Sequence, residues 1–323
     1  MSASEFQLIN QFFANQNLYR DDVIIGIGDD CAVVRPIPNE LLAVSIDTCV
    51  EGVHFPVNTS AQCIGHKTLA VSLSDMAAMG ANPQWATLAI TLPKADESWI
   101  ADYCQGFFDL ANRYNVQLVG GDITKGSLTI TTQLHGSIPQ KDILKRSGAQ
   151  IGDLIYVTGT IGTAGLGLLI KQQSINIPPA LKDEIPNYIR KLECPEPRVE
   201  VGLALRAIAT AVIDVSDGLA ADLGHILQAS DVGAEINLEN IPVTKGFDLL
   251  KDQLSQWQQP LTAGDDYELC FTAPPSHQTK IQAIAEKTQT PINPIGVITE
   301  NKSIQCLYNG ELIPLELKGF EHF

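Results

Sequence analysis

Short apolar runs alternate with polar, glycine-rich segments along the whole chain. In the first half, runs of branched apolar residues predict strands, and longer stretches with an apolar residue about every 3.6 positions predict helices. On this pattern we expect strands at 41–46, 85–92, 116–119 and 128–134, and helices at 61–79 and 96–114. The first helix is expected to end at Gly80, with Pro83 shortly beyond it.

The same alternation restarts after the segment Gly148–Gly152. Beyond it we expect strands at 154–157, 211–215, 269–272 and 295–298, helices at 199–209 and 219–229, and a turn at Asn309-Gly310 between short strands. A chain of 323 residues suits two domains of about 150 residues each. The sequence therefore predicts an α+β fold with α/β layers, divided into residues 1–145 and 146–323.

The charge balance excludes one broad class of function. Lys and Arg number 21 against 37 Asp and Glu, which gives a net charge of −16. Proteins that coat nucleic acids need basic surfaces, so no nucleic-acid partner is expected, although divalent cations can still bridge an acidic protein to one nucleotide. The opening residues do not resemble a secretory leader, and no apolar run is long enough to span a membrane, so we expect a cytoplasmic protein without a membrane partner.

Aspartates beside glycines or at predicted element ends are the main candidates for chemistry. Six of them stand out: Asp30, Asp47, Asp75, Asp122, Asp214 and Asp217. Mg²⁺ takes hard oxygen ligands, usually one or two carboxylates per ion together with phosphate oxygens. Any single one of these residues could instead be a turn former or a helix cap. As a set they predict a Mg²⁺-dependent enzyme that acts on phosphates.

Other candidate residues are less specific on their own. The pair Gly120-Gly121 could let the backbone approach a phosphate, but such pairs are also common in tight turns. Arg146 could clamp a terminal phosphate, with an ordinary surface arginine as the alternative, and for His54 the alternative to a functional role is a packed or exposed histidine. The sequence has no P-loop or dinucleotide motif, and no Ser-His-Asp or Cys-His arrangement stands out.

Ten sequence blocks in a fixed order carry a more specific signal. They are GIGDDCA, SIDT, HF, LSDMAAMGANP, GGDIT, RSGA, GDLIYVTG, IDVSDGL, GDDYELCF and KGFEHF. In order and spacing the chain resembles the thiamine-monophosphate kinases, which belong to the aminoimidazole-ribonucleotide-synthetase-like ATP-binding superfamily. The resemblance runs from Glu5 to Phe323.

The resemblance implies a fold and an activity. It implies a homodimer in which the N-terminal sheets of two copies join in a barrel, and a C-terminal α/β domain that completes an active-site cleft. It also implies that ATP, held with several Mg²⁺ ions, passes its γ-phosphoryl group directly to thiamine monophosphate, which yields thiamine diphosphate and ADP. Such in-line transfer depends on positioning and charge neutralisation, so no catalytic side chain is expected.

Carried over by motif, the resemblance assigns roles to residues of this chain. The six aspartates and the Ile46 backbone are expected to hold metal; Ser45, Tyr103, Gly121, Asp122, Arg146 and Ser216 to contact ATP; and His54, Asp265 and Leu317 to contact the thiamine substrate. Two positions depart from the family pattern. Ile46 replaces a common Thr, which leaves only a backbone carbonyl there, and Leu317 replaces an aromatic residue that can stack on the substrate ring.

Three alternatives remain open on the sequence. Selenophosphate synthetases need a reactive Cys in an N-terminal glycine-rich loop, whereas no Cys precedes Cys31 here. The blocks of aminoimidazole ribonucleotide synthetases fit less well than GDDYELCF and KGFEHF. A non-catalytic nucleotide or cation sensor is the alternative from another class, although it could lose some of the six aspartates that this chain retains.

Overall fold

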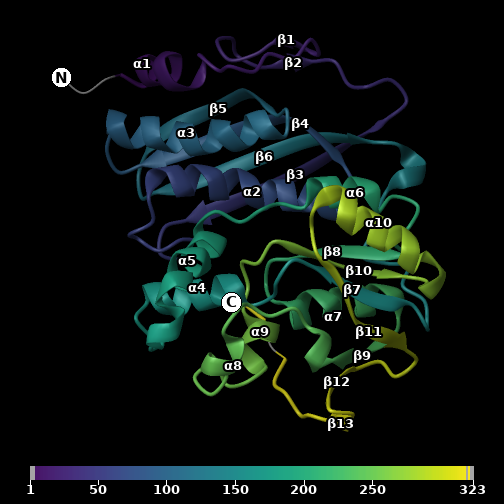
Figure 1. Ribbon diagram of the computed structural model, residues 1–323. Coiled ribbons are helices and arrows are strands. Elements are labelled where there is room, and N and C mark those ends of the chain that lie inside the picture. The colour runs from purple at the N-terminus through teal and green to yellow at the C-terminus, as the bar shows by residue number, and fades with distance from the viewer. Residues whose placement is uncertain (1–3, 318, 321–323) are drawn as a thin grey trace. The chain divides into compact units, whose positions relative to one another are not determined.

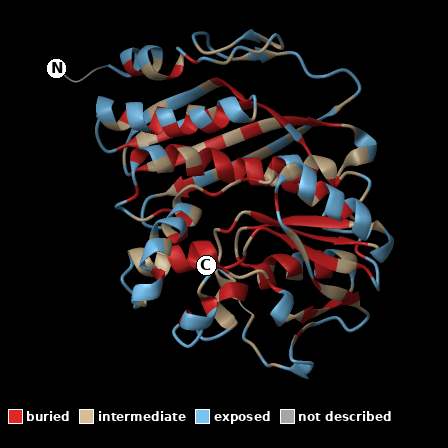
Figure 2. Ribbon diagram, in the orientation of Figure 1, coloured by how far each residue is buried: buried red, intermediate tan, exposed pale blue. Residues whose placement is uncertain are grey.

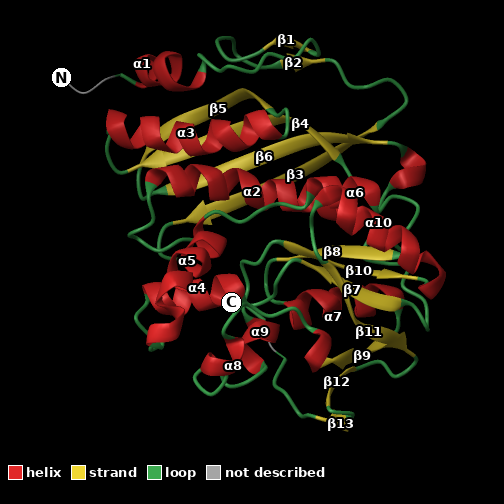
Figure 3. Ribbon diagram, in the orientation of Figure 1, coloured by secondary structure: helices red, strands yellow, loops and turns green. Residues whose placement is uncertain are grey.

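The computed structural model describes residues 4–317 and 319–320, and it divides into two compact units (Figure 1). One unit comprises Met1–Met76 and Ala81–Lys141, and the other comprises Ala77–Gly80 and Asp142–Phe323. Each unit combines a sheet with helices, so the α+β class predicted from the sequence is confirmed (Figure 3). Among the described residues, the helices are all too short or too polar to traverse a bilayer.

The first unit is built on a four-stranded mixed sheet with the order β3-β6-β4-β5. β6 pairs antiparallel with β3 and β4, and β4 pairs parallel with β5. The elements of this unit are α1 Glu5–Leu8, a π-helical turn Ile9–Phe13, β1 Val23–Ile25, β2 Val33–Val34, β3 Leu41–Val50, α2 Ala61–Met79, β4 Asn82–Leu92, α3 Glu97–Arg113, β5 Gln117–Lys125 and β6 Thr129–Ile138.

Helices α2 and α3 pack closely against each other and cover one face of this sheet (Figure 1). Glycines make the close approach possible: a Cβ at Gly65 would lie 2.0 Å from the Tyr103 carbonyl oxygen, and one at Gly106 would lie 1.8 Å from the Gln62 carbonyl oxygen. Alternate β6 residues such as Ile130 and Leu134 are buried, and the sheet and helices of this unit carry both buried and exposed stretches (Figure 2). The opposite face of the sheet stays more accessible.

The second unit contains a seven-stranded sheet with the order β13-β12-β9-β11-β7-β10-β8. All pairs are antiparallel except β12 with β9. Its strands are β7 Leu154–Thr158, β8 Ala211–Val215, β9 Gly233–Asn237, β10 Glu268–Ala273, β11 Ile292–Thr299, β12 Ile304–Tyr308 and β13 Glu311–Leu312. Its helices are α4 Thr163–Lys171, α5 Ile185–Glu193, α6 Val199–Ala204, α7 Leu219–Ser230, α8 Phe247–Leu250, α9 Gln258–Thr262 and α10 Gln278–Thr288. Helix α7 joins the sheet in the main apolar core.

Several expected element ends differ from those in the structure. The first strand continues through Asp47 to Val50, and β5 continues through Asp122 to Lys125, because both stay paired with their neighbours. The predicted helix at 199–209 ends at Ala204, and Ala207 takes a left-handed φ of 57° that a helix cannot continue through. As a result, Asp47 and Asp122 project from strands rather than from the turns after them.

Candidate active site

One group of candidate residues lies where β3 faces helix α2. Ser45 and Asp47 are two residues apart on β3, so both side chains leave the same face of the strand. Ser72 and Asp75 are three apart on α2 and therefore share one face of the helix. The Ser45 hydroxyl donates to the Asp75 carboxylate, and the Ser72 hydroxyl donates to Asp47 Oδ2 at 2.7 Å. The structure thus brings three predicted site residues together.

The Asp47 carboxyl is held in a half-buried position. Burial raises its pKa, and the hydroxyls of Ser72 and Ser45 work against that rise. Hydroxyl donors orient the carboxylate without neutralising it, so its charge remains for a cation. Ser72 was missed in the sequence, although its spacing of three from Asp75 on one helix face could have identified it.

Asp122 lies far from this group within the same sheet. Asp47 on β3 pairs with Thr132 on β6, Thr132 pairs with Leu88 on β4, and Leu88 pairs with Gly121 on β5. These four positions form one row across the sheet and face the same side of it. Asp122 belongs to the next row, so its side chain leaves the other face of the sheet. In addition, β3 and β5 are the two edges of the sheet, three strand spacings or about 14 Å apart. Within one copy, Asp47 and Asp122 cannot bind the same ion.

Two further candidates of the first unit lie in loops. His54 sits in the turn after β3, where its Nδ1 accepts a hydrogen bond of 3.0 Å from the Val50 backbone N–H. In the neutral ring this leaves the proton on Nε2, which can donate to a phosphate oxygen. Asp30 is exposed, and its backbone N–H donates to the Asp29 carboxylate at 2.9 Å.

Tyr103 does not lie where the motif predicts a nucleotide contact. Its side chain is 0% exposed on α3, and its hydroxyl is 3.0 Å from the Thr68 hydroxyl on α2. Its ring also stacks between Trp99 and Phe107. The close packing of the two helices therefore makes Tyr103 a core residue of the first unit.

The second unit presents its candidates around the segment that follows β8. Asp214 is buried near the end of that strand, and Ser216 and Asp217 lie directly beyond it, half-buried. The Ser216 carbonyl accepts a hydrogen bond of 2.8 Å from the Asp265 backbone N–H. The predicted nucleotide and metal residues of this unit are therefore joined directly to the residue predicted to contact the substrate.

A buried carboxylate on α7 fastens the same segment from the other side. Asp222 Oδ2 accepts hydrogen bonds of 3.0 Å from the backbone N–H groups of both Ser216 and Asp217. Burial raises the pKa of Asp222 to about 7, and the nearby Asp217 charge adds to that rise. The Arg146 charge acts in the opposite direction, so Arg146 lies within electrostatic reach of this segment. Asp222 was also missed in the sequence.

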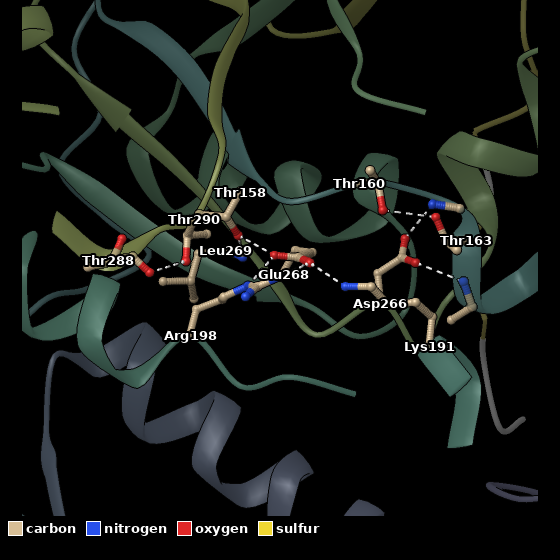
Figure 4. Close-up of polar contacts among 12 residues, drawn as sticks. Thr158, Thr160, Thr163, Lys191, Arg198, Asp266, Glu268, Leu269, Thr288 and Thr290 are labelled. Atoms are coloured by element: carbon tan, nitrogen blue, oxygen red, sulfur yellow. Dashed lines mark hydrogen bonds and ion pairs between the residues drawn. The ribbon is translucent and has the colours of Figure 1, made fainter. Parts of the chain in front are cut away.

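The segment Asp265–Glu268 sends its acidic residues to different environments. Asp265 and Tyr267 take left-handed φ angles of 70° and 49°, and the Tyr267 hydroxyl donates to Asp265 Oδ1 at 3.2 Å. Asp266 is buried and accepts the backbone N–H groups of Gly162 and Ala164 at the start of α4 (Figure 4). Of these two aspartates, only Asp265 is therefore accessible to a ligand, whereas Asp266 binds the backbone at the N-terminus of α4.

Glu268 is the centre of a buried ionic network (Figure 4). Its carboxylate receives two hydrogen bonds of 2.6 Å from the Arg198 guanidinium and one of 2.7 Å from the Thr158 hydroxyl, and Lys191 lies 3.5 Å away. This network anchors the start of β10, two residues from Asp266. No local sequence pattern predicts this network, because Arg198 and Glu268 are 70 residues apart in the chain.

The described part of the chain's end crosses the same segment. The Phe320 backbone N–H donates to the Asp217 carbonyl oxygen at 3.1 Å, and the Phe320 side chain is 49% exposed. Gly319 fits closely there, since a Cβ would lie 2.6 Å from the Asp217 carbonyl oxygen. Leu317, by contrast, packs against the apolar core of the second unit. At the described end of the chain, it is therefore Phe320 rather than Leu317 that lies next to the candidate site.

The candidate ligands suit Mg²⁺, which also binds water and phosphate oxygens, better than a metal ion whose ligands are all protein side chains. Among the described residues, no three His, Cys, Asp or Glu side chains gather as a cluster that could hold an ion. The candidates are instead carboxylates and hydroxyls in ones and twos. Mg²⁺ typically binds through such sparse oxygen ligands, with water and substrate phosphates completing its octahedron.

Sequence comparisons relate the chain to known proteins over both units. The family described as AIR synthase related protein, N-terminal domain, matches residues 28–138, and its C-terminal domain counterpart matches residues 150–309. Thiamine-monophosphate kinase of Buchnera aphidicola subsp. Acyrthosiphon pisum (strain APS) is 43% identical over 327 residues, which cover 100% of each chain.

Solved structures are similar over the same length. The crystal structure of thiamine-monophosphate kinase from Stenotrophomonas maltophilia K279a has a TM-score of 0.86 and 43% identity, and the match covers 97% of this chain and 99% of that one. A structure of AaThiL complexed with AMPPCP and TMP has a TM-score of 0.74 and 29% identity, and the match covers 92% of each chain.

Proposed function

The chain belongs to the thiamine-monophosphate kinase family, and on that premise we propose that it phosphorylates thiamine monophosphate with ATP, yielding thiamine diphosphate and ADP. The observation that carries this proposal is the 43% identity to a thiamine-monophosphate kinase over the entire length of both chains. A related structure holds AMPPCP together with TMP, which fits a reaction between ATP and thiamine monophosphate.

Mg²⁺ ions are assigned to the aspartates of both units. In the proposal, residues 1–145 form the ATP- and Mg²⁺-binding domain that also dimerises, and residues 146–323 form the second domain. The proposed ligands are Asp30, Asp47, Asp75, Asp122, Asp214, Asp217 and the Ile46 backbone carbonyl. The Ile46 side chain leaves the strand face opposite Ser45 and Asp47, so only its backbone suits this role. When bound, Mg²⁺ neutralises phosphate charge and orients the γ-phosphoryl group.

The remaining contacts are assigned by the chemistry that each group offers. Ser45, Gly121, Arg146 and Ser216 are proposed to contact the nucleotide, through hydroxyls, backbone N–H groups and a guanidinium. His54 and Asp265 are proposed to contact thiamine monophosphate, with His54 Nε2 donating to its phosphate. None of these groups has to form a covalent bond to the phosphoryl group, because the acceptor is a phosphate oxygen of the substrate.

The proposed unit of activity is a homodimer in which the N-terminal sheets of two copies join in a barrel. The exposed face of edge strand β3 supports this, since Leu42, Val44 and Ile46 are 53%, 52% and 63% exposed on one side of it. The wide separation of Asp47 and Asp122 in one copy supports it independently. If β5 of a second copy lies beside β3, about one strand spacing separates the second copy's Asp122 from Asp47, compared with three spacings within one copy.

The direct test is to incubate the purified chain with ATP, Mg²⁺ and thiamine monophosphate and to quantify thiamine diphosphate and ADP by chromatography. Equal amounts of both products are expected, and none without Mg²⁺. Thiamine should not replace thiamine monophosphate, because the acceptor is a phosphate oxygen. Nucleotide binding without either product would instead favour a sensor.

Phe320→Ala is expected to raise KM for thiamine monophosphate about five- to tenfold and to leave kcat nearly unchanged, because an aromatic ring contributes uniform binding to the substrate ring. Leu317→Ala is the matched comparison. Leu317 packs against the core, so its truncation should lower the thermal midpoint rather than change KM. If Leu317→Ala raised KM and Phe320→Ala did not, the contact with the substrate ring would have to be assigned to Leu317.

A further inference from the structure

Asp222 is a buried titratable residue that the proposed reaction does not use. It lies in the first turn of α7 and is only 2% exposed, so it cannot contact ATP or thiamine monophosphate directly. A carboxylate is costly to bury unless its oxygens accept hydrogen bonds. Here a single oxygen, Oδ2, accepts the N–H groups of Ser216 and Asp217 at 3.0 Å each.

These two hydrogen bonds add to others that hold the backbone of residues 216–218 in place. The Ser216 carbonyl is bound by the Asp265 N–H, and the Asp217 carbonyl is bound by the Phe320 N–H. Gly218, with φ of 113°, then turns the chain into α7, and a Cβ there would lie 2.8 Å from the Thr262 backbone. With Asp222 in place, both N–H groups and both carbonyls of Ser216-Asp217 are held by separate parts of the second unit.

We propose that Asp222 is a positioning residue, which fixes the Ser216-Asp217 backbone so that the Asp217 carboxylate is preorganised to bind Mg²⁺ with the nucleotide. The inference rests on the proposed function, since it assumes that Asp217 binds metal. Residues that orient metal ligands from behind typically change metal affinity by about 10- to 100-fold when they are removed. Asp222 acts on the ligand through the backbone rather than through its side chain.

Two substitutions at this position separate hydrogen bonding from charge. Asp222→Ala removes the acceptor, so both N–H groups lose their partner. Asp222→Asn keeps one carbonyl oxygen, which has two lone pairs and can accept both N–H groups where Oδ2 does now. If Asp222 positions the Ser216-Asp217 backbone through these hydrogen bonds, Asp222→Asn should retain most of the Mg²⁺ affinity that Asp222→Ala loses.

The control is another buried aspartate of the second unit. Asp153 is 4% exposed, and its Oδ2 also accepts two hydrogen bonds, from the Gln150 N–H at 3.0 Å and the Thr210 hydroxyl at 2.6 Å. Neither of these partners belongs to the candidate site. Asp153→Ala should therefore lower the thermal midpoint as Asp222→Ala does, without changing metal affinity.

The test is calorimetric titration of Mg²⁺ into each variant saturated with AMPPCP, with amide exchange of the 211–220 segment measured by mass spectrometry. Asp222→Ala is expected to weaken Mg²⁺ binding about 10-fold or more and to speed exchange in that segment, with Asp222→Asn close to the parent protein. Normal Mg²⁺ affinity in Asp222→Ala, or equal loss in Asp153→Ala, would overturn the inference. Asp217→Asn with unchanged affinity would instead refute the metal role of Asp217 itself.

Discussion

Asp47→Asn and Asp122→Asn are each expected to abolish thiamine diphosphate formation, yet an equal mixture of the two variants should recover about a quarter of the parent activity. The two residues lie on opposite edges of one sheet, about 14 Å apart, and on opposite faces. A site that needs both must therefore take them from different copies. In a mixed dimer, one site then carries both substitutions and the other carries neither.

The size of the recovery follows from random assembly. After dissociation and reassociation, about half of the dimers contain one copy of each variant, and one site in each of these is intact. The activity should be measured at matched total protein, with native mass spectrometry confirming that mixed dimers form.

A mixture of Asp47→Asn and Asp75→Asn provides the matched control. Ser45 links Asp75 to the strand that carries Asp47, so the proposal assigns both residues to the same site of one copy. Every site in the mixed dimer then lacks one ligand, and no recovery is expected. Recovery in this control, or its absence in the Asp47 and Asp122 mixture despite mixed dimers, would contradict a site shared between copies.

The sequence pattern predicted most helices and strands because the residues that define each of them are close together in the chain. The helix at 61–79 and the strand at 211–215 have the expected ends, since a glycine stops the first and apolar residues define the second. The six aspartates could be recognised from their neighbours in the chain. Their grouping could not, because it depends on which strands pair.

Strand order is the clearest case of information that the pattern lacks. Asp47 and Asp122 both follow β-forming residues and look equivalent in the sequence, but the order β3-β6-β4-β5 places them on opposite edges. Burial is another case. Tyr103 fits the motif of a nucleotide contact, yet two glycines bring α2 and α3 so close that its side chain is enclosed.

The acidic residues of GDDYEL show why neighbouring carboxylates cannot be sorted from sequence alone. Asp265 takes a left-handed φ of 70°, after which Asp266 and Glu268 are buried while Asp265 is not. Their partners come from distant parts of the chain, at Gly162 and Arg198. Sequence reasoning identified the motif, and long-range packing decides which of its acids can meet a substrate.

Arg198→Met is expected to lower the free energy of unfolding of the second unit by about 3–5 kcal/mol, because it leaves a buried carboxylate without its main partner. Glu268 is 1% exposed, and two guanidinium hydrogen bonds of 2.6 Å satisfy it. Urea denaturation at neutral pH measures the change. Lys302→Met removes an exposed ion pair with Asp231 and should cause no measurable change, because solvent screens that pair.

The loss in Arg198→Met should shrink as the pH falls. Burial alone would raise the pKa of Glu268, but the Arg198 guanidinium outweighs it and holds that pKa below its usual value of 4.5. A depressed pKa stabilises the fold at pH values above the unfolded pKa, and this contribution is lost as the pH falls through the folded pKa. In Arg198→Met, burial is no longer opposed by that cation, so Glu268 takes up a proton more readily and the unpaired charge disappears. A stability gap that stays constant between pH 7.5 and pH 5 would mean that Arg198 contributes through packing of its side chain and not through its charge on Glu268.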